Sequence, residues 1–429
     1  MFELEKGIAL GILILVYALM ISEKVHRTVA VLMGAVMMVG LGIVGETGVI
    51  KYIQWEALGL IFGMFIIVAA LSRSGFFRWI GLHTLQKTKF NPILIFVLFS
   101  VLSAVLAAFM DSITVMMFMA ALIVEVCWIL EVPVLPFLLG AICSANIGGA
   151  ATMVGDPPNV LIGTQLGFTF SDFLIHVGPI AIVMFVANII FLKYYFSKVW
   201  VKKNVDVGKI YREHAELNPF KAVKNLRHMQ ITLVVFAITV TLLMMHRYLD
   251  MMIATISIMG ATIVLLTSGD NSSDILDKID WQTIIFLAGL FVIVGGLQSV
   301  GLLEDLANAL VSVTGGEPIL VVTLMLWTFA PISAFLDNVP FAAAMIPVIQ
   351  SISQTTGIQL TTLAWTLAIV SDVSGNATPI GSSASVVGVA IARKRGIHIH
   401  WKEYCRAAFP AMLLCVAVAN VMLVVMYVL

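Results

Sequence analysis

Four aspartates interrupt long apolar stretches of this sequence: Asp111, Asp156, Asp337 and Asp372. A charged side chain at the centre of a bilayer costs roughly 2.5–3.5 kcal/mol even on lenient insertion scales, so such residues usually bind protons or cations. A structural alternative applies to Asp111 and Asp337, because each opens the second arm of a hairpin and would cap a helix N-terminus there. All four carboxylates are therefore candidates for binding a coupling proton.

Neutral polar residues surround these aspartates and extend the candidate site. Hydroxyls, amides and freed backbone carbonyls are hard oxygen ligands, suited to Na⁺ or to a polar oxyacid. No Lys or Arg is expected at this depth, which argues against a strongly anionic substrate that needs a bidentate clamp. The candidate substrate- and ion-binding residues are Asp111, Ser112, Thr114, Asn146, Gly149, Thr152, Asp156, Asn159, Asp337, Asn338, Asp372, Asn376, Thr378, Ser382 and Ser385.

Two stretches rich in small and polar residues, 144–159 and 370–385, carry most of the candidates. The first lies between apolar runs at 134–147 and 160–167, and neither run is long enough to span a bilayer alone. Together they can cross with a non-helical interruption, which is tolerated where the freed backbone groups line a polar cavity. Discontinuous helices of this kind build the central sites of secondary transporters. Their half-helix N-termini favour anionic or oxygen-rich groups.

The second stretch repeats the first at an offset of 226 residues. Chance matches of Leu, Val and Ala are common in apolar sequence, but matches of Trp, Pro, Gly and Asp in one register are not. The matched pairs include Trp55 with Trp281, Gly63 with Gly289, Pro92 with Pro318, Asp111 with Asp337, Thr152 with Thr378 and Gly155 with Gly381. Asp156 instead corresponds to Ser382, and Asp372 to Asn146. The chain is therefore a tandem duplication whose halves have divided roles.

The composition is that of a polytopic membrane protein. Hydrophobic residues make up 61% of the chain and charged residues 11%, against about a quarter charged in soluble domains. Soluble enzyme classes are therefore excluded, and no enzymatic chemistry is predicted. The net charge is zero, so no nucleic-acid partner is implied. The four cysteines are scattered without CxxC spacing, so we expect no metal site and no disulfide framework.

A spanning helix needs about 20 apolar residues, and the two halves repeat one order of candidate segments. In the first half these are 7–22, 28–46, 55–72, an amphipathic piece at 76–86, an interrupted run at 92–127, a broken run at 134–167 and 173–195. In the second half they are 230–247, 251–267, 281–298, an amphipathic piece at 302–313, an interrupted run at 318–351, a broken run at 360–393 and 405–428. The sequence therefore predicts an all-α membrane protein.

The two interrupted runs, 92–127 and 318–351, are compatible with re-entrant hairpins or with two full spans each. With re-entrant hairpins each half crosses five times, and 20 of the 24 Lys and Arg residues fall in the cytoplasm, as the positive-inside rule requires. Two full spans each would place the basic segment 393–406 outside. Five crossings invert the second half. The predicted fold therefore has inverted repeats of five transmembrane helices each, with two re-entrant hairpins and two broken helices.

The predicted organisation has three parts. Repeat 1 comprises residues 1–196 and holds the hairpin that faces the cytoplasm. Residues 197–229 form a basic cytoplasmic linker. Repeat 2 comprises residues 230–429 and holds the hairpin that faces outside. Both termini are predicted to lie outside.

Three motifs match those of a known group of transporters: Asn146-Ile-Gly-Gly-Ala-Ala-Thr-Met-Val-Gly-Asp-Pro-Pro-Asn159, Ser333-Ala-Phe-Leu-Asp-Asn-Val-Pro-Phe341 and Gly375-Asn-Ala-Thr-Pro-Ile-Gly381. The sequence resembles the ion transporter superfamily, in particular its arsenite permease (ArsB)/NhaD branch and permeases of the P-protein (pink-eyed-dilution) type. The resemblance implies elevator-type alternating access, a scaffold that commonly dimerises, and a site formed by two hairpin tips and two helix breaks. The sequence departs from this pattern at Ser112 and Ser385, where relatives often have Asn.

The resemblance implies a secondary active transporter of the bacterial inner membrane. The leading hypothesis is proton-coupled efflux of arsenite or antimonite. A Na⁺/H⁺ antiporter, a sodium-coupled di- or tricarboxylate transporter and an anion channel are the alternatives. The protein would bind a small inorganic or organic ion, with H⁺ or Na⁺ as the coupling ion and no other cofactor. Its expected partners are the lipid bilayer, a second copy of the chain and, for an arsenite pump, a cytoplasmic ATPase subunit.

Overall fold

The computed structural model describes residues 2–22, 24–201, 219–269, 272–335 and 337–429. Every regular element in these ranges is helical, and none of the ranges contains a strand. The prediction of an all-α chain is confirmed. Helices satisfy their backbone hydrogen bonds internally, which is what a segment inside a bilayer requires.

The helices follow the predicted order and agree closely in extent. In the first half they are α1 (Phe2–Ile21), α2 (Arg27–Gly40), α3 (Glu46–Tyr52), α4 (Trp55–Ser74), α5 (Phe76–Thr88), α6 (Pro92–Ala107), α7 (Ser112–Leu130), α8 (Val134–Ala150), α9 (Pro157–Leu166), α10 (Phe170–His176), α11 (Gly178–Tyr195) and α12 (Ser197–Val201). In the second half they are η1 (Pro219–Ala222), α14 (Leu226–Leu249), α15 (Ile253–Ser268), α16 (Ser272–Leu276), α17 (Trp281–Ser299), α18 (Leu302–Thr314), α19 (Pro318–Ser333), α20 (Asn338–Thr356), α21 (Leu360–Ser374), α22 (Ser383–Lys394) and α23 (Trp401–Tyr427).

Three predicted segments differ in detail. The span at 28–46 is shorter than expected, because α2 ends at Gly40 and Gly42 adopts the left-handed conformation that closes helices. The span at 173–195 is divided into α10 and α11, since Pro179 at the start of α11 has no backbone N–H to continue the earlier helix. The linker is shorter than 197–229 because α14 already begins at Leu226, and residues 202–218 of the linker lie outside the described residues.

Among the described helices, six are long and apolar enough to cross a membrane: α4, α7, α11, α14, α17 and α23. The pair α18 and α19 would add a seventh span, although the two helices meet at 119°. Shorter apolar helices pack among these spans, namely α2, α6, α8, α15 and α21. The protein is therefore a multi-pass membrane protein.

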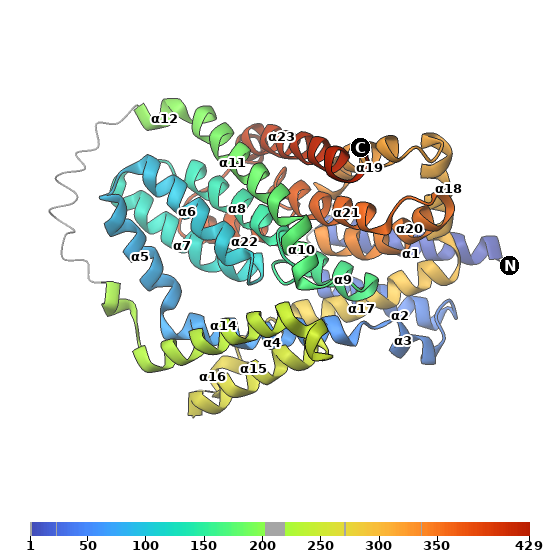
Figure 1. The fold of residues 1–429 in the computed structure, drawn as a ribbon, viewed down its shortest axis with the longest axis horizontal. Coiled ribbons are helices and arrows are strands. Elements are labelled where there is room, and N and C mark those ends of the chain that lie inside the picture. The colour runs from blue at the N-terminus through green and yellow to red at the C-terminus, as the bar shows by residue number, and fades with distance from the viewer. Residues whose placement is uncertain (1, 23, 202–218, 270–271, 336) are drawn as a thin grey trace.

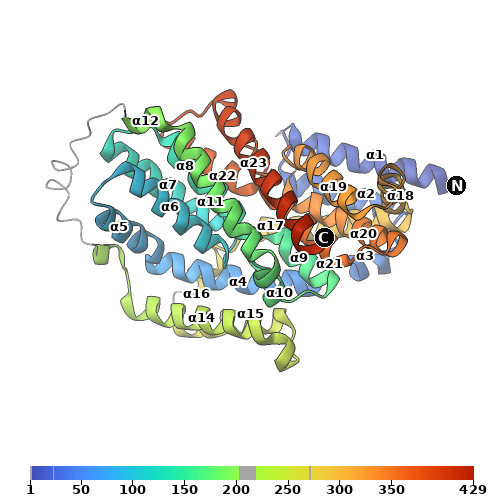
Figure 2. The same cartoon turned by 45° about the horizontal axis from the view of Figure 1, so that its top comes forward.

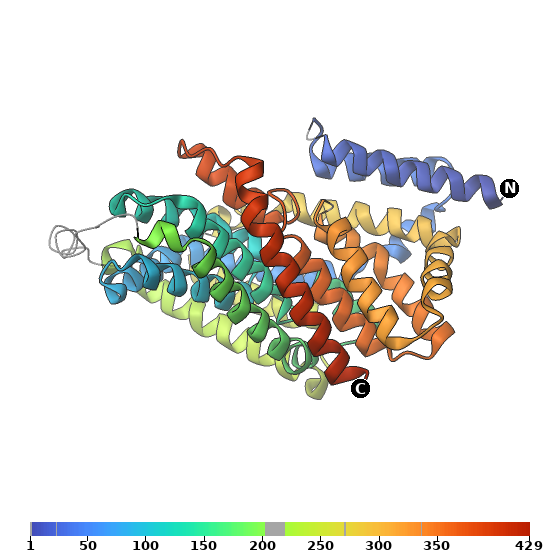
Figure 3. The same cartoon turned by 90° about the horizontal axis from the view of Figure 1, so that it is seen from above.

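Two groups of helices flank the centre of the molecule. Helices α4, α14 and α15 pack together along its lower edge in Figure 1, and α2 packs against α17. Helix α1 lies at the periphery, where it contacts α2 and α17 (Figure 3). Helices α11 and α23 lie side by side and cross the molecule obliquely (Figure 2).

Each interrupted run forms two consecutive helices, α6 and α7 in the first half and α19 and α20 in the second, which we call the hairpins; their re-entrant course stays a prediction. Each first arm begins with a proline at its first position, Pro92 or Pro318, where the missing N–H costs nothing. The α6–α7 pair lies at one end of the molecule beside α5, and the α19–α20 pair lies at the other end beside α18 (Figure 1). Each first arm packs on the broken helix of its own half, α6 on α8 and α19 on α21.

The second arms pack across the two halves. Helix α7 contacts α22, the second piece of the broken helix in the other half, and α20 contacts α9. Each second arm also packs on the broken helix of its own half, α7 on α8 and α20 on α21, so it lies between the two halves. The packing of α7 on α22 and of α20 on α9 brings both hairpin tips and both helix breaks close together.

Candidate functional site

Both broken helices are interrupted by the same backbone conformation. The residue before the second piece is extended in each case, with φ −145° and ψ 149° at Asp156 and φ −143° and ψ 154° at Ser382. These two residues are partners at the offset of 226. The duplication seen in the sequence therefore extends to the local structure of the two breaks.

Equivalent threonines attach each break to the hairpin of its own half. Thr152 donates its hydroxyl to the carbonyl of Ala108, and Thr378 donates to the carbonyl of Ala334 at 2.5 Å. Ala108 and Ala334 are the C-cap residues of α6 and α19, whose last carbonyls have no partner inside the helix. Both threonines thus position a break and a hairpin tip, rather than facing a ligand.

Gly155 has no room for a side chain, because a Cβ added there would collide with the carbonyl oxygens of Gly149 and Ala107. We expect Gly155→Ala to lower the free energy of unfolding by about 1–3 kcal/mol, the usual cost of overpacking. Thermal melting of the purified protein in detergent measures this as a lower Tm. Gly11→Ala is the matched control, because a Cβ at Gly11 meets no atom within 4 Å. Equal Tm values for the two variants would contradict the close approach at the break.

Five side chains from both halves form what we call the acidic cluster: Asp156, Asp372, Ser112, Asn338 and Asn159. Asp156 accepts hydrogen bonds from the Ser112 hydroxyl at 2.7 Å and from the Asn338 amide at 2.8 Å. Asp372 accepts from the same Asn338 amide at 3.3 Å and from Asn159 at 3.2 Å. The cluster therefore joins the first hairpin tip, the first break, the second hairpin tip and α21.

The two carboxylates of the acidic cluster are buried together. Asp156 is 3% exposed and Asp372 is fully buried. Both accept a hydrogen bond from the same Asn338 nitrogen, at 2.8 and 3.3 Å, and the side chains that donate to them are all neutral. Two negative charges at this separation repel strongly in a medium of low dielectric constant. A proton or a monovalent cation shared by the pair removes this repulsion, so the cluster can bind either.

A second group, which we call the neutral cluster, comprises Asn146, Asn376, Ser382, Ser385 and Tyr404. Asn146 donates to Asn376 at 2.8 Å and to Ser382 at 2.9 Å. Ser385 lies 2.9 Å from the Ser382 hydroxyl and accepts from the Tyr404 hydroxyl at 3.1 Å. All five side chains are buried. Sequence reasoning missed Tyr404, because an aromatic residue in the last span has no local signal that marks it.

The two clusters occupy equivalent positions in the duplicated halves. Asn159 bonds the carbonyl of Gly149 at 2.9 Å, and its partner Ser385 bonds the carbonyl of Gly375 at 3.2 Å. Among the described residues, the amide oxygens of Asn146 and Asn159 accept no hydrogen bond. Buried acceptors without partners cost free energy, so both oxygens are available to a ligand that donates or to a cation.

Asp111 caps a helix, as the structural alternative predicts. Its carboxylate accepts hydrogen bonds from the backbone of Ile113 at 2.8 Å and Thr114 at 3.3 Å, and from the Thr114 hydroxyl at 2.5 Å. These bonds satisfy donors at the start of α7 that have no partner inside the helix. Asp111 and Thr114 therefore hold the shape of the first hairpin tip.

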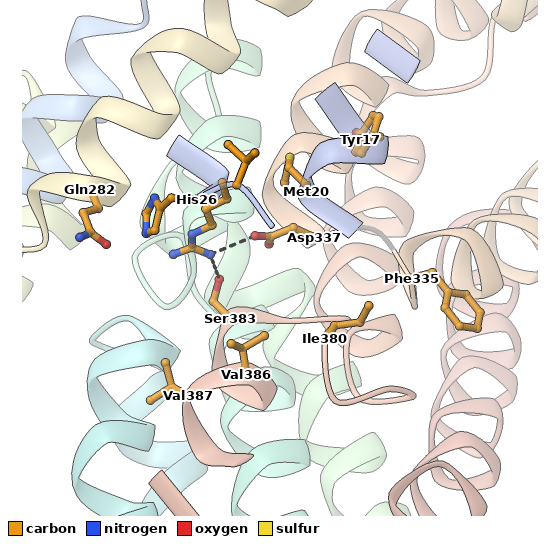
Figure 4. Close-up of a pocket in the computed structure, with 12 residues that line it drawn as sticks. Tyr17, Met20, His26, Gln282, Phe335, Asp337, Ile380, Ser383, Val386 and Val387 are labelled. Carbon is orange, nitrogen blue, oxygen red and sulfur yellow. Dashed lines mark hydrogen bonds and ion pairs between the residues drawn. The ribbon is translucent and has the colours of Figure 1, made fainter. Parts of the chain in front are cut away.

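Asp337 is bonded to an arginine, which the sequence did not predict. Arg27, the first residue of α2, donates from Nη1 to Asp337 Oδ2 at 3.1 Å and to the Ser383 hydroxyl at 2.8 Å, the two interactions drawn as dashed lines in Figure 4. The expectation of a site without Lys or Arg is therefore wrong. Arg27 falls in a short loop by sequence, and its long side chain reaches residues more than 300 positions away.

A cavity of about 410 Å³ lies beside this ion pair. Its polar lining includes Arg27 together with His26, Gln282, Asp337 and Ser383. Figure 4 shows the last four among apolar side chains. The lining of a smaller void includes Arg27 and Asp337 together with Asp156 and Asn338. The cavity and the acidic cluster are therefore neighbours.

The predicted site residues fall into four sets. Nine belong to the two clusters: Ser112, Asn146, Asp156, Asn159, Asn338, Asp372, Asn376, Ser382 and Ser385. Gly149, Thr152 and Thr378 shape the breaks, and Asp111 and Thr114 form a helix cap. Asp337 points to Arg27 and lines the cavity.

The sequence can now be compared with known proteins. Residues 17–370 match the family of citrate transporters (CitMHS). The chain belongs to this family. The matched range includes Arg27, both hairpins and the first break, whereas Asp372 and the second break follow it. Citrate transporter family membership agrees with the multi-pass helical structure described above.

Individual relatives match nearly the full length of this chain. An uncharacterized transporter of Mycobacterium tuberculosis is 33% identical over 405 residues, which are 93% of this chain and 94% of the relative. A 46 kDa membrane protein of Mycobacterium leprae is 33% identical over 430 residues, or 98% of both chains. The human P protein is 28% identical over 506 residues, covering 99% of this chain and 60% of the P protein. The predicted similarity to the P-protein type is thus confirmed, and the arsenite permease/NhaD branch stays a prediction.

Proposed function

We propose that this protein is a proton-coupled secondary active transporter of a small carboxylate anion. The observation that carries the proposal is the buried Asp156–Asp372 pair, at which two hairpin tips, the first helix break and α21 meet. A pair of buried carboxylates with neutral donors can take up and release one proton or one monovalent cation. Such binding supplies the coupling step.

Two features support a carboxylate as the transported substrate. The family is named for citrate transport. The Arg27 guanidinium lines a cavity next to the acidic cluster, and arginine binds carboxylates through a planar fork of donors. The N-termini of α9 and α22 open at the breaks and add partial positive charge, which favours an anion.

The proposed mechanism is elevator-type alternating access within an inverted-repeat fold. The equal conformations at Asp156 and Ser382, and the packing of α7 on α22 and α20 on α9, support two repeats related by a twofold axis in the membrane plane. The hairpins at opposite ends of the molecule support re-entrant loops that enter from opposite sides. Five crossings per repeat would place both termini outside and the cavity on the cytoplasmic side. The chain would act as a dimer in a bacterial inner membrane.

A second candidate is proton-coupled efflux of arsenite or antimonite. The neutral cluster favours it, because hydroxyls and amides suit an uncharged oxyacid. Such a pump would also engage a cytoplasmic ATPase subunit. A Na⁺/H⁺ antiporter that uses only the acidic cluster is the third candidate, since carboxylate and amide oxygens are hard ligands for Na⁺. These candidates share one site and differ in the ion whose transport is coupled to proton movement.

Proton flux in proteoliposomes distinguishes the candidates. The purified protein is reconstituted with a pH-sensitive dye inside, and citrate, arsenite or sodium is added alone. We expect citrate to cause proton movement and the other two to cause none, with protein-free liposomes as the control. A response to arsenite only or to sodium only would replace the proposal by the matching candidate. Citrate current without proton movement would indicate a channel.

A further inference from the structure

Arg27 is held in place on several sides. Its guanidinium lies 5.6 Å from the centre of the Phe286 ring, within the range of a cation–π contact. Nη1 bonds the Ser383 hydroxyl at 2.8 Å. About one third of the side chain remains exposed, at the wall of the 410 Å³ cavity. The guanidinium is thus both preorganised and accessible from the cavity.

The ion pair with Asp337 uses only part of the arginine. Nη1 alone contacts one oxygen of Asp337, at 3.1 Å. In the described part of the chain, the other oxygen, Oδ1, has no hydrogen-bond partner although it is buried. Arginine has five donors and pairs most strongly when two of them meet both oxygens of one carboxylate. The geometry therefore leaves room for a better carboxylate ligand than Asp337.

The cavity provides the space for that ligand. Its volume of about 410 Å³ falls within the usual range of small-molecule sites. Among the described residues that line it, Arg27 is the only Lys or Arg, and Asp337 is the only Asp or Glu. His26, Gln282 and Ser383 add groups that can bond further carboxylate or hydroxyl oxygens. An anion that enters the cavity meets the guanidinium of Arg27, which is already paired with the carboxylate of Asp337.

We infer that Arg27 is the anchor for a carboxylate group of the substrate, and that Asp337 occupies this anchor when the cavity is empty. The inference rests on the proposed transport of a carboxylate and names the residue that recognises it. When the substrate binds, its carboxylate replaces that of Asp337 at the guanidinium, and no covalent bond is made or broken. The exchange also frees the second hairpin tip from α2, so substrate binding and release of the hairpin are linked.

Replacing Arg27 and replacing Asp337 should change the affinity for citrate in opposite directions. Arg27→Gln removes the anchor, and we expect it to weaken citrate binding by about tenfold or more. Asp337→Asn removes the internal competitor, and we expect binding to tighten about threefold or more, since affinity is reduced by the fraction of anchors already occupied. Asn also serves well at the start of a helix, so α20 is preserved. The double variant should bind as weakly as Arg27→Gln alone.

Isothermal titration of the full-length protein in detergent with citrate tests the inference. Lys6→Gln is the matched control, because Lys6 pairs with Asp305 at 2.5 Å, away from the cavity lining, and its loss should leave the Kd unchanged. If Arg27→Gln does not fold, Arg27→Lys keeps the charge without the fork, and it should bind more weakly than the native protein.

Three results would overturn the inference. Unchanged citrate affinity in Arg27→Gln would leave the proposed function standing but remove Arg27 from the site. Weaker binding in both single variants, with recovery in the double variant, would show a purely structural ion pair. A native protein that binds no citrate would overturn the inference and the proposed function together.

Discussion

Replacing Asp372 with Asn is expected to abolish proton-coupled transport in a protein that still folds. The substitution keeps the shape of the side chain but removes one charge from the buried pair with Asp156. The remaining carboxylate no longer needs a shared proton to offset a second charge, so uptake and release of that proton are lost. We expect proton flux in proteoliposomes to fall by about 100-fold or more, the scale on which proton-transfer groups contribute.

The Asp250→Asn variant is the control for replacing a carboxylate by an amide outside the acidic cluster. Asp250 is exposed at the end of α14 in the left-handed conformation, which Asn adopts readily, so its flux and Tm should match the native protein. Asp156→Asn should reproduce the loss seen for Asp372→Asn. Full coupling in either cluster variant would contradict a role for the pair, and loss of folding in both would indicate that the carboxylates are structural.

Asn338→Ala is expected to lower both stability and transport. The Asn338 amide bonds Asp156 at 2.8 Å and Asp372 at 3.3 Å, so it connects the second hairpin tip to both carboxylates. Hydrogen bonds to charged groups contribute about 1.5 kcal/mol or more each, so losing two should lower the free energy of unfolding by about 3 kcal/mol. Thermal melting in detergent measures the change as a lower Tm. Flux should fall with it, because the carboxylates lose the group that holds them together.

Asn188→Leu provides the comparison for Asn338→Ala. Asn188 is also buried, in α11, but neither polar atom of its side chain has a hydrogen-bond partner among the described residues. Replacing it with an apolar residue of similar size should leave stability unchanged or raise it, because an unsatisfied amide is removed. A similar Tm decrease in both variants would show that burial, rather than the two hydrogen bonds of Asn338, sets the effect.

Hydropathy and local sequence signals predict most of the helices, because helix length and helix breaks are set by neighbouring residues in the chain. Apolar length sets the extent of a helix such as α4, and the prolines at 157 and 158 mark the first break without reference to the rest of the chain. The offset of 226 then predicts the second break from the first. The early end of α2 at Gly40 escaped prediction, because the glycines at 40, 42 and 45 lie within an apolar run that is long enough to span.

The partners within the site depend on long-range packing and could not be predicted. Asn338 connects Asp156, 182 residues away, with Asp372, and no local pattern indicates this. Arg27 follows the positive-inside rule as a loop residue, yet its side chain lies at the second hairpin tip. Tyr404 joins the neutral cluster from the last helix. In each case the residue type is visible in the sequence, but its contact is set by how the two halves pack.

The packing of α7 and α20 on the opposite halves means that the site can be completed only late in synthesis. Helix α9 and Asp156 are inserted into the membrane well before α20, whose tip supplies Asn338. Until then the carboxylate of Asp156 lacks one of its two donors, and α7 lacks the surface of α22. The first half alone cannot complete either cluster. A nascent chain that ends before α20 would therefore leave Asp156 without the Asn338 donor and α7 without the surface of α22.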